Sequence, residues 1–316
     1  MKILFVADPL SGFKIEKDTT FAMMREAQRR GHTLWACTAQ QLRWRRHEPV
    51  TARCVRIELL QGNSAPWFAV QEEQPALALH AVDAVVMRKD PPFDSEYFYA
   101  THLLEQAQRQ GARVFNSPKA LRDHSEKLAI MEFEDYIAPT LVTRDADEVR
   151  AFHAQHHDII LKPLDGMGGM GIFRVGPDGL NLGSIIETLN AGGATTLMVQ
   201  RYLPEISQGD KRVLLIAGKP VPYALARIPQ GSEIRGNLAA GGKGVAQPLS
   251  ARDREIALAL GPVLARRGLL LVVLDIIGDC LTEINVTSPT GFQEIMKQTD
   301  CDVASLFMDA LQEAAG

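Results

Sequence analysis

The sequence predicts an α/β protein whose first part, residues 1–122, is an open α/β domain with mostly parallel strands. Short apolar runs rich in Val, Ile and Leu alternate there with amphipathic stretches of helical period. This alternation is typical of parallel strands joined by crossover helices. From residue 123 onward, glycine-rich and acidic segments interrupt the alternation. They predict a second unit of mixed α and β structure, residues 123–316.

The elements of the first domain follow one another in a regular order. Ile3–Ala7 is an apolar run that predicts a strand, and Asp18 is placed to cap a helix that ends at Arg30 before Gly31. Trp44–Leu79 is harder to assign and is interpreted as a β excursion. The other expected elements are strands at Thr33–Cys37, Ala84–Met87 and Ala112–Phe115 and a helix at Ser95–Gln110.

The second unit contains several short elements and one long loop. The loop, Ile228–Gly244 (IPQGSEIRGNLAAGGKG), is rich in glycine, and loops of this length are often lids. A hairpin is expected over Gly218-Lys219. The expected helices are Ser117–Phe133, Asp145–Gln155, Leu182–Asn190, Ala251–Arg267 and Val303–Ala314, and the expected strands are Thr196–Gln200, Arg212–Ile216 and Pro222–Ile228.

The composition favours a soluble enzyme. The chain has 316 residues, 46% of them hydrophobic, with 34 Lys and Arg against 38 Asp and Glu, so its net charge is −4. This balance argues against a nucleic-acid partner, and no apolar run is long enough for a membrane span. The four cysteines show neither metal nor redox spacing, which is typical of a reducing cytoplasm.

A glycine-rich loop joins two apolar β-type runs within Ile159–Val175. Its glycines Gly166, Gly168 and Gly171 fit G-x-G-x-x-G, but the residues that follow are again a β run. A dinucleotide fingerprint must open a helix, so the loop is interpreted as a hairpin tip. Its backbone N–H groups could approach phosphate oxygens, although an ordinary flexible hairpin explains the glycines equally well.

Lys162 is a lone charge in the first of these apolar runs, Ile-Ile-Leu-Lys-Pro. A buried lysine needs a partner, and a nucleotide phosphate at the neighbouring glycine loop would supply one. The alternative is a lysine at the end of a strand that reaches solvent.

Two carboxylates and an amide occur close together in LDIIGDCLTEINVTSP, which is interpreted as a strand pair. Glu283 and Asn285 are two residues apart and so face the same side of a strand. A three-residue turn, Gly278–Cys280, or an equivalent bulge would place Asp275 opposite Glu283. Such an all-oxygen set suits Mg²⁺ completed by phosphate oxygens and water.

Charged residues also follow the expected strand Ala84–Met87. Arg88 and Asp90 stand before Pro91-Pro92, and ligands of open α/β sheets bind at the carboxyl ends of strands. Together with Asp18, they form a candidate site for a substrate carboxylate. A structural turn explains the two prolines equally well.

The order of these parts resembles the ATP-grasp superfamily of ADP-forming ligases. More narrowly, RKDPPFD, ILKPLDGMGG, IPQGSEIRGNLAAGGKG and LDIIGDCLTEINVTSPTG resemble the bacterial glutathione synthetase family. The resemblance implies that residues 123–316 form a two-lobed ATP-grasp domain. Its lid lobe would span about 123–198, and its C-terminal catalytic lobe about 199–316 with a mobile loop at 228–244.

The resemblance also implies roles for individual residues. ATP would be the co-substrate, and Asp275, Glu283 and Asn285 would hold Mg²⁺ or Mn²⁺. The implied nucleotide contacts are Lys127 and Lys162 with the α and β phosphates, Gly166, Gly168 and Gly169 in the covering loop, Gln200, Tyr202 and Leu203 near the adenine, and Asp210 near the ribose. Arg212 and Arg227 would steady the γ-phosphate, and Arg235, Ser288 and Thr290 would contact the peptide or glycine.

The implied reaction joins γ-glutamylcysteine and glycine through an acyl phosphate and yields glutathione, ADP and phosphate. A homotetramer is implied as well. Two alternatives stay open from the residues alone. One is another ATP-grasp carboxylate–amine ligase, of the D-alanine–D-alanine or glutamate ligase type. The other is a regulatory module that binds nucleotide without turnover.

Overall fold

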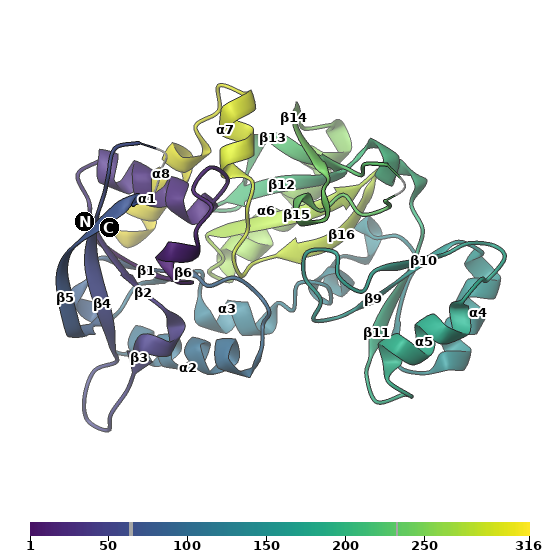
Figure 1. The fold of residues 1–316 in the computed structure, drawn as a ribbon, viewed down its shortest axis with the longest axis horizontal. Helices are drawn as coiled ribbons and strands as arrows, with labels where there is room; N and C mark the ends of the chain where they lie inside the picture. Colours follow the sequence, from purple (N-terminus) through teal and green to yellow (C-terminus); the bar gives the residue numbers. More distant parts are fainter. Residues whose placement is uncertain (63–65, 232) are drawn as a thin grey trace.

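The computed structural model describes residues 1–62, 66–231 and 233–316 and contains three β-sheets, each with its own strand order. Figure 1 shows them along the long axis of the molecule, with the two chain termini side by side at one end and helices α4 (Ala146–His156) and α5 (Leu182–Asn190) at the other. The mixed α/β class predicted from the sequence is confirmed.

The first sheet has the strand order β3-β4-β2-β1-β6-β7, with β5 paired to β4. Its central pairs, β1 with β2, β1 with β6 and β6 with β7, are parallel as predicted. The β excursion is an antiparallel pair, β4 and β5, and residues 63–65 of it lie outside the described residues. The strands are β1 (Lys2–Ala7), β2 (Thr33–Cys37), β3 (Leu42–Arg43), β4 (Thr51–Leu59), β5 (Phe68–Ala78), β6 (Ala84–Arg88) and β7 (Val114–Phe115).

Helix α1 (Thr19–Arg29) joins the first sheet to the end of the chain. Asp18 Oδ1 accepts a hydrogen bond from Phe21 N (2.7 Å), so the expected cap is present. Phe21 and Met24 are buried in one apolar cluster with Phe307 of α8 (Val303–Ala315). The last helix therefore completes the core of the first domain. The remaining helices of this region are α2 (Ser95–Arg109) and α3 (Pro118–Asp123).

The second sheet has the order β10-β9-β11-β8 and carries α4 and α5. Its own apolar core includes Val149, Leu161 and Ile186. β10 pairs antiparallel with β9, and Phe173 lies opposite Leu161, so the prediction of a glycine-tipped hairpin is confirmed. The strands are β8 (Thr140–Thr143), β9 (Ile159–Pro163), β10 (Phe173–Val175) and β11 (Leu197–Arg201).

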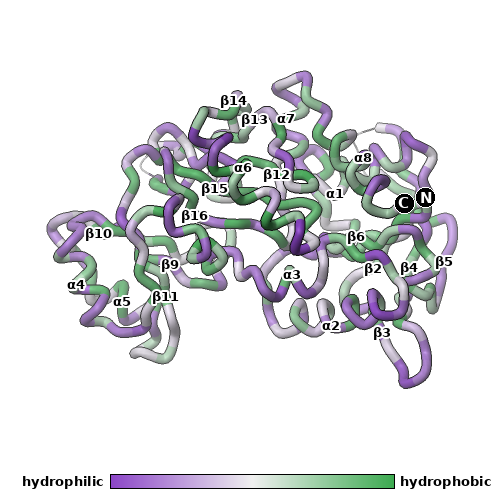
Figure 2. The backbone as a smooth tube through the Cα atoms, turned by 180° about the vertical axis from the view of Figure 1, so that it is seen from behind, coloured by the Kyte–Doolittle hydropathy of each residue, from purple (hydrophilic) through white to green (hydrophobic). Residues whose placement is uncertain are grey.

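The third sheet has the order β14-β13-β12-β15-β16 and is antiparallel throughout. Figure 2 shows its central strands as a hydrophobic band. The strands are β12 (Asp210–Ile216), β13 (Lys219–Ile228), β14 (Lys243–Pro248), β15 (Leu271–Ile277) and β16 (Cys280–Asn285), and the helices are α6 (Ala251–Arg266) and α7 (Phe292–Gln298).

One expected helix, Ser117–Phe133, is wrong. The segment forms α3, an irregular stretch around Ser125–Leu128, and then the 3-10 helix η4 (Ala129–Tyr136). In the irregular stretch, Glu126 O accepts a hydrogen bond from Ile284 N of β16 (2.9 Å). A contact with a distant strand thus replaces the local helical hydrogen bond that the sequence pattern favoured.

Three strands were not predicted, and one is shorter than expected. The missed strands are β3, β8 and β14, and the expected strand Ala112–Phe115 is reduced to the two residues of β7. β14 contains glycine and proline and takes its place by pairing with β13, from Ile228↔Lys243 to Tyr223↔Pro248. It therefore includes the last two residues of the expected 228–244 loop.

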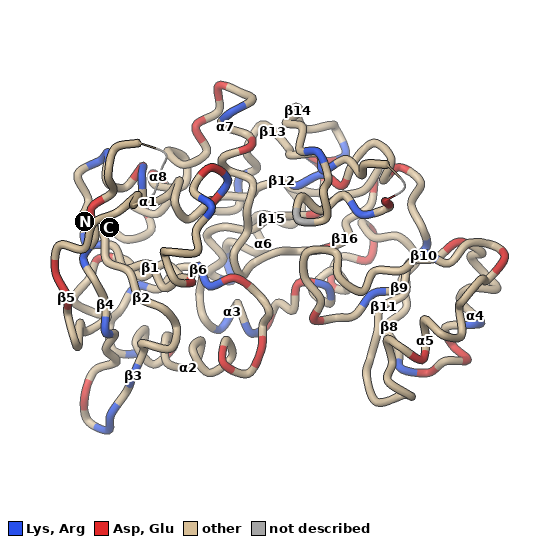
Figure 3. Tube along the Cα trace, viewed as in Figure 1, with Lys and Arg blue, Asp and Glu red and all other residues tan. Residues whose placement is uncertain are grey.

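Charged side chains of both signs are interspersed along the chain (Figure 3). No helix within residues 1–62, 66–231 and 233–316 combines the length and apolar character needed to cross a membrane.

Candidate active site

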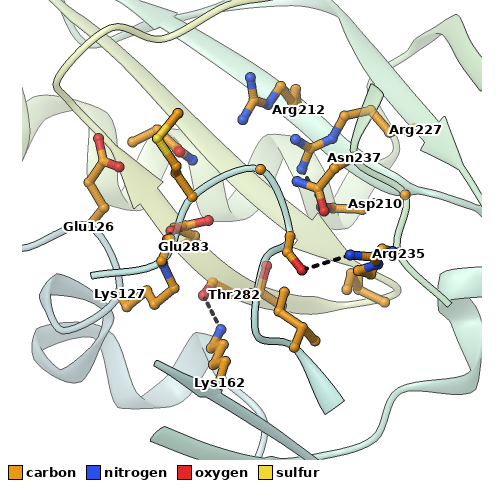
Figure 4. A pocket seen from close by; sticks show the side chains of 18 of the residues that line it. Glu126, Lys127, Lys162, Asp210, Arg212, Arg227, Arg235, Asn237, Thr282 and Glu283 are labelled. Atoms are coloured by element: carbon orange, nitrogen blue, oxygen red, sulfur yellow. Dashed lines mark hydrogen bonds and ion pairs between the residues drawn. The ribbon is translucent and has the colours of Figure 1, made fainter. Parts of the chain in front are cut away.

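A cavity of about 370 Å³ lies where the glycine loop, the 228–244 loop and the third sheet meet. Figure 4 shows charged side chains converging on it from several elements. Most of the candidate residues line it: Asp90, Lys127, Lys162, Gly166, Gly168, Gly169, Gln200, Tyr202, Leu203, Asp210, Arg212, Arg227, Arg235, Glu283, Asn285, Ser288 and Thr290. Residues far apart in the sequence are thus assembled around one space.

Three candidates do not line the cavity: Asp18, Arg88 and Asp275. Arg88 is buried and donates to Thr20 Oγ1 (3.0 Å) and to Pro289 O (2.8 Å). Asp18 is engaged as the cap of α1. Both therefore stand behind the cavity wall, and Arg88 supports the 288–290 segment from its rear.

The β15–β16 hairpin carries the acidic candidates. Asp275 lies directly opposite Glu283, as predicted, but the register shifts between Asp275 and Ile276. The turn itself has two residues, Gly278 and Asp279, so the expected three-residue turn is wrong and the alternative bulge is right. The extra residue in β16 is Thr282, and it restores the alignment of the two carboxylates.

Asp275 lies behind the cavity wall and is held by two arginines that line the cavity. Arg212 Nε donates to Asp275 Oδ1 (3.2 Å), and Arg227 Nη2 donates to Asp275 Oδ2 (2.8 Å) and also to Asp210 Oδ2. Burial raises the pKa of Asp275, but the two guanidinium groups outweigh it and hold that pKa below its usual range. Both carboxylate oxygens of Asp275 are therefore engaged by side chains.

The donor atoms at the cavity fit a magnesium ion in part. Glu283 is partly exposed to the cavity, and Asn285 donates through Nδ2 to Val273 O (3.4 Å), which leaves its Oδ1 as an acceptor. A carboxylate and an amide oxygen suit a hard cation that also takes phosphate oxygens and water. Glu283 and Asn285 therefore fit as ligands, whereas Asp275 would first have to leave its arginines.

Two buried lysines face the same side of the cavity (Figure 4). Lys162 Nζ has a single long contact with Thr282 O (3.4 Å), and burial lowers its pKa to about 8. Lys127 Nζ donates to Gly166 O (2.5 Å) and pairs with Glu283 Oε1 (3.1 Å). An ammonium group offers three donors, so both side chains have capacity for the oxygens of a polyphosphate.

The glycine loop and the 228–244 loop meet over the cavity. Arg235 Nη1 donates to Gly169 O (3.3 Å), and Figure 4 marks this bond with a dashed line at Arg235. Gly169 has φ +84°, and a Cβ there would lie 2.6 Å from Asn237 Oδ1. The left-handed backbone therefore favours glycine at this position, and a Cβ would also displace the Asn237 side chain.

At the far end of the cavity, β11 runs into the segment Tyr202-Leu203. Tyr202 N donates to Asp158 O (2.9 Å), and the guanidinium of Arg174 stacks 3.7 Å from the Tyr202 ring centroid. Arg174 in turn forms an ion pair with Asp158 (2.6 Å). This arrangement fixes the segment expected to meet the adenine.

Several cavity residues were not singled out from the sequence, notably Glu126, Met167, Thr282 and Asn237. Glu126 directly precedes Lys127, but its importance depends on contacts at and just beyond the end of β16, such as the one with Val286, 160 residues away. The role of Thr282 follows from its position as the extra residue of the β-bulge in β16. A sequence pattern gives no signal for either feature.

Two family models match the chain. The model described as the prokaryotic glutathione synthetase N-terminal domain matches residues 1–122, and the one described as the prokaryotic glutathione synthetase ATP-grasp domain matches residues 126–300. This chain belongs to the prokaryotic glutathione synthetase family. The ATP-grasp fold and the family resemblance noted in the sequence are thereby confirmed.

Full-length relatives agree with this assignment to the glutathione synthetases. A protein named glutathione synthetase from Ralstonia nicotianae is 60% identical over 316 residues, covering 100% of this chain and 97% of the relative. One of the same name from Neisseria meningitidis serogroup A is 57% identical (99% of each chain), and one from Shewanella oneidensis is 50% identical (100% and 99%).

Solved structures share the fold at low identity. D-cycloserine synthetase DcsG superposes with a TM-score of 0.70 at 16% identity, covering 99% of this chain and 100% of that one. The ATP-grasp ligase PsnB in complex with a minimal precursor gives a TM-score of 0.64 at 18% identity, covering 99% of each chain.

The chain is therefore an ATP-dependent, ADP-forming ligase of the glutathione synthetase type, and its substrates are the small molecules ATP, γ-glutamylcysteine and glycine. It uses ATP as co-substrate with Mg²⁺ as the metal. The alternatives left open from the residues, a different ATP-grasp ligase or a non-catalytic module, have no comparable support among these full-length relatives.

Proposed function

We propose that some of the cavity residues bind the nucleotide during glutathione synthesis and that others neutralise the charge of the reacting groups. The observation that carries this proposal is the convergence of Lys127, Lys162, Arg212 and Arg227 on the cavity that Glu283 also lines. Four cations around one enclosed space suit a triphosphate and the charge that develops during its transfer.

The nucleotide would lie between the second and third sheets. Lys127 and Lys162 hold the α and β phosphates, the glycine loop covers them, and Gln200 to Leu203 receive the adenine. Asp210 contacts the ribose or organises the site through Arg227. Glu283 and Asn285 would hold Mg²⁺, joined by Asp275 once it exchanges an arginine. An ion held there would supply positive charge to the phosphate oxygens.

The chemistry needs no protein nucleophile. The cysteinyl carboxylate of γ-glutamylcysteine attacks the γ-phosphorus, and ADP leaves. Arg212 and Arg227 stabilise the charge on the transferred group. The amine of glycine then attacks the acyl phosphate, phosphate departs with the C–O bond electrons, and the amine loses a proton to give the amide. Water must be excluded because an acyl phosphate hydrolyses readily.

The substrates would enter at the end of the cavity formed by Asp90, Ser288 and Thr290. The side chain of Thr290 accepts a hydrogen bond from Arg212, so this end adjoins the proposed γ-phosphate site. Arg235 contributes from the 228–244 loop, which acts as a mobile lid over the intermediate. Arg88 and Asp18 support this end from behind.

Isotope transfer tests the acyl-phosphate step. γ-Glutamylcysteine labelled with ¹⁸O in its cysteinyl carboxylate should pass one labelled oxygen to the released phosphate. Mass spectrometry of the phosphate reads this directly. Unlabelled phosphate formed together with glutathione would contradict the intermediate.

The proposal also covers the two lobes of the ATP-grasp domain, the oligomeric state and the cellular location of the protein. The lid lobe spans about residues 123–198, and the catalytic lobe about residues 199–316. A homotetramer is supported by large apolar side chains exposed at and just before the start of α2, Phe93, Phe98 and Tyr99, and light scattering would measure it. Four free cysteines are in keeping with a cytoplasmic location.

A further inference from the structure

Glu126 is a charged residue at the cavity to which the proposed reaction assigns no role. It lies in the irregular stretch between α3 and η4, directly before Lys127. Figure 4 shows it beside Lys127 and Glu283. Burial and the neighbouring Glu283 raise its pKa, so its carboxylate is placed at an electrostatic cost. Such a cost calls for a compensating function.

Glu126 accepts hydrogen bonds from the end of β16 and from the two residues that follow it. Its main-chain oxygen accepts from Ile284 N (2.9 Å). Its side-chain Oε1 accepts from Val286 N (2.9 Å), Thr287 N (3.0 Å) and Thr287 Oγ1 (2.8 Å). Glu126 thus receives four hydrogen bonds from three residues within the segment 284–287.

These hydrogen bonds replace a missing neighbouring strand. β16 is the last strand of the third sheet, so only one of its edges pairs with β15. Its other edge forms an isolated parallel bridge from Leu281 to Ile137, and beyond that bridge it would present unpaired N–H groups. Glu126 caps Ile284 and Val286 at that edge, and these two residues flank Asn285 and follow Glu283. The main chain that carries the proposed metal ligands is therefore held from both sides.

Lys127, the next residue in the chain, contacts a carboxylate and the glycine loop. Its Nζ pairs with Glu283 (3.1 Å) and donates to Gly166 O of the glycine loop (2.5 Å). The dipeptide Glu126-Lys127 consequently joins three parts: the strand of the metal ligands, the phosphate-binding lysine and the phosphate-covering loop. A shift of Glu126 would move them relative to one another.

We propose that Glu126 is a positioning residue that sets the place of the Glu283 and Asn285 ligands relative to the phosphate-binding Lys127. The proposal rests on the roles assigned above to those three residues. The carboxylate is needed because an anionic acceptor forms stronger hydrogen bonds to N–H groups than a neutral one. Glutamine keeps the size of the side chain and loses that strength.

The test compares Glu126→Gln with a matched control, Glu134→Gln, in the adjoining helix η4. Glu134 is exposed, its main-chain oxygen accepts from Ile137 N, and its side chain forms no hydrogen bond with the residues that the structure describes. Binding of Mn²⁺ in the presence of the β,γ-imido analogue of ATP is measured by electron paramagnetic resonance. Loss of a supporting partner of metal ligands typically weakens metal binding roughly ten- to a hundredfold, and this is the shift expected for Glu126→Gln.

Steady-state kinetics provide a second readout. Glu126→Gln should raise the Mg²⁺ concentration needed for half-maximal activity and lower kcat, while the KM for glycine stays within about twofold. Glu134→Gln should match the parent in every measurement. A general loss of folding would instead lower the thermal midpoint and reduce the active fraction without changing the metal dependence.

A second variant keeps the test decisive if Glu126→Gln folds poorly. Thr287→Val removes one donor and leaves the carboxylate in place, so a smaller shift in Mn²⁺ affinity in the same direction is expected. Parent-like Mn²⁺ affinity in both variants would overturn the proposal. If Glu283→Ala also kept parent affinity, the metal site itself would be misassigned, so the two failures are distinguishable.

Discussion

Several charged residues at the cavity are paired with groups of opposite charge, whereas Lys162 contacts a main-chain oxygen, Thr282 O. Lys127 is paired with Glu283, and Arg227 lies between Asp210 and Asp275. Burial of these groups without partners would be costly. Phosphate oxygens and a metal ion offer the same charges in the same places. We propose that these partners are exchanged when ATP binds.

Glu283→Ala removes the proposed metal ligand that is most open to the cavity. Turnover should fall on the order of a thousandfold, because the ion supplies several kcal/mol of charge stabilisation, while the fold is retained. Phosphate release and the thermal midpoint are the measurements. Asp279→Ala, an exposed acid at the turn of the same hairpin, is the control. Full activity of Glu283→Ala would refute the metal assignment.

The lowered pKa of Lys162 leads us to expect that nucleotide binding depends on pH. Burial lowers its pKa to about 8 in the free protein, and a bound phosphate should raise it again. A group whose pKa rises on binding takes up protons, so nucleotide affinity should fall as pH increases above about 8. Calorimetry of ADP binding in buffers of different ionisation enthalpy measures this proton uptake.

Lys162→Arg is the matched variant for that experiment, since a guanidinium stays protonated throughout this range. Its ADP affinity should be nearly constant between pH 7 and pH 9, whatever its absolute value. An identical pH profile in parent and variant would show that another group is responsible.

At the scale of elements, the sequence anticipated the hairpins better than the segments between them. The glycine-tipped hairpin and the Asp275–Glu283 pairing follow from period-two patterns and from turn residues, which are local. Residues 124–128 could not be predicted in the same way. Their conformation is decided by Glu126 and Lys127 reaching β16, a contact between distant parts of the chain.

A substitution in the 228–244 loop tests whether catalysis requires the close packing of this loop against β13. A Cβ at Gly236 would lie 2.2 Å from Arg227 O, so Gly236→Ala must push the loop away from β13. We expect kcat/KM to fall on the order of tenfold to a hundredfold through displacement of the neighbouring Arg235. Steady-state kinetics with all three substrates would show it.

Gly183→Ala in α5 is the control for this substitution. A Cβ there meets nothing within 4 Å and the backbone is not in the left-handed region, so stability should rise by about 0.5–1 kcal/mol without any change of activity. Unchanged kcat/KM in Gly236→Ala would mean that the loop position is unimportant for catalysis.

At the scale of the whole molecule, the open α/β domain was predictable because its parallel strands are continuous apolar runs. The way in which the parts assemble was not, since the packing of α8 onto α1 joins the two ends of the chain. Arg88 illustrates the consequence for the site. Its position after a strand indicated a substrate contact, yet the assembled fold places it behind Pro289.

A substitution of Asn116 tests how much the junction between the first domain and the third sheet contributes to stability. Its side chain accepts from Leu270 N (2.7 Å) and Leu271 N (2.9 Å) and donates to Leu271 O and Val286 O. Asn116→Ala leaves these buried groups without partners and should lower the free energy of unfolding by about 2–4 kcal/mol. Urea denaturation measures this, and a loss below about 0.5 kcal/mol would contradict the interpretation.

Ligase activity is tested by phosphate release from ATP with Mg²⁺, γ-glutamylcysteine and glycine, each omitted in turn. Phosphate should be released only in the complete mixture, with one glutathione formed for each phosphate and identified by its mass. Nucleotide binding without turnover in the complete mixture, or turnover that does not depend on glycine, would contradict this expectation.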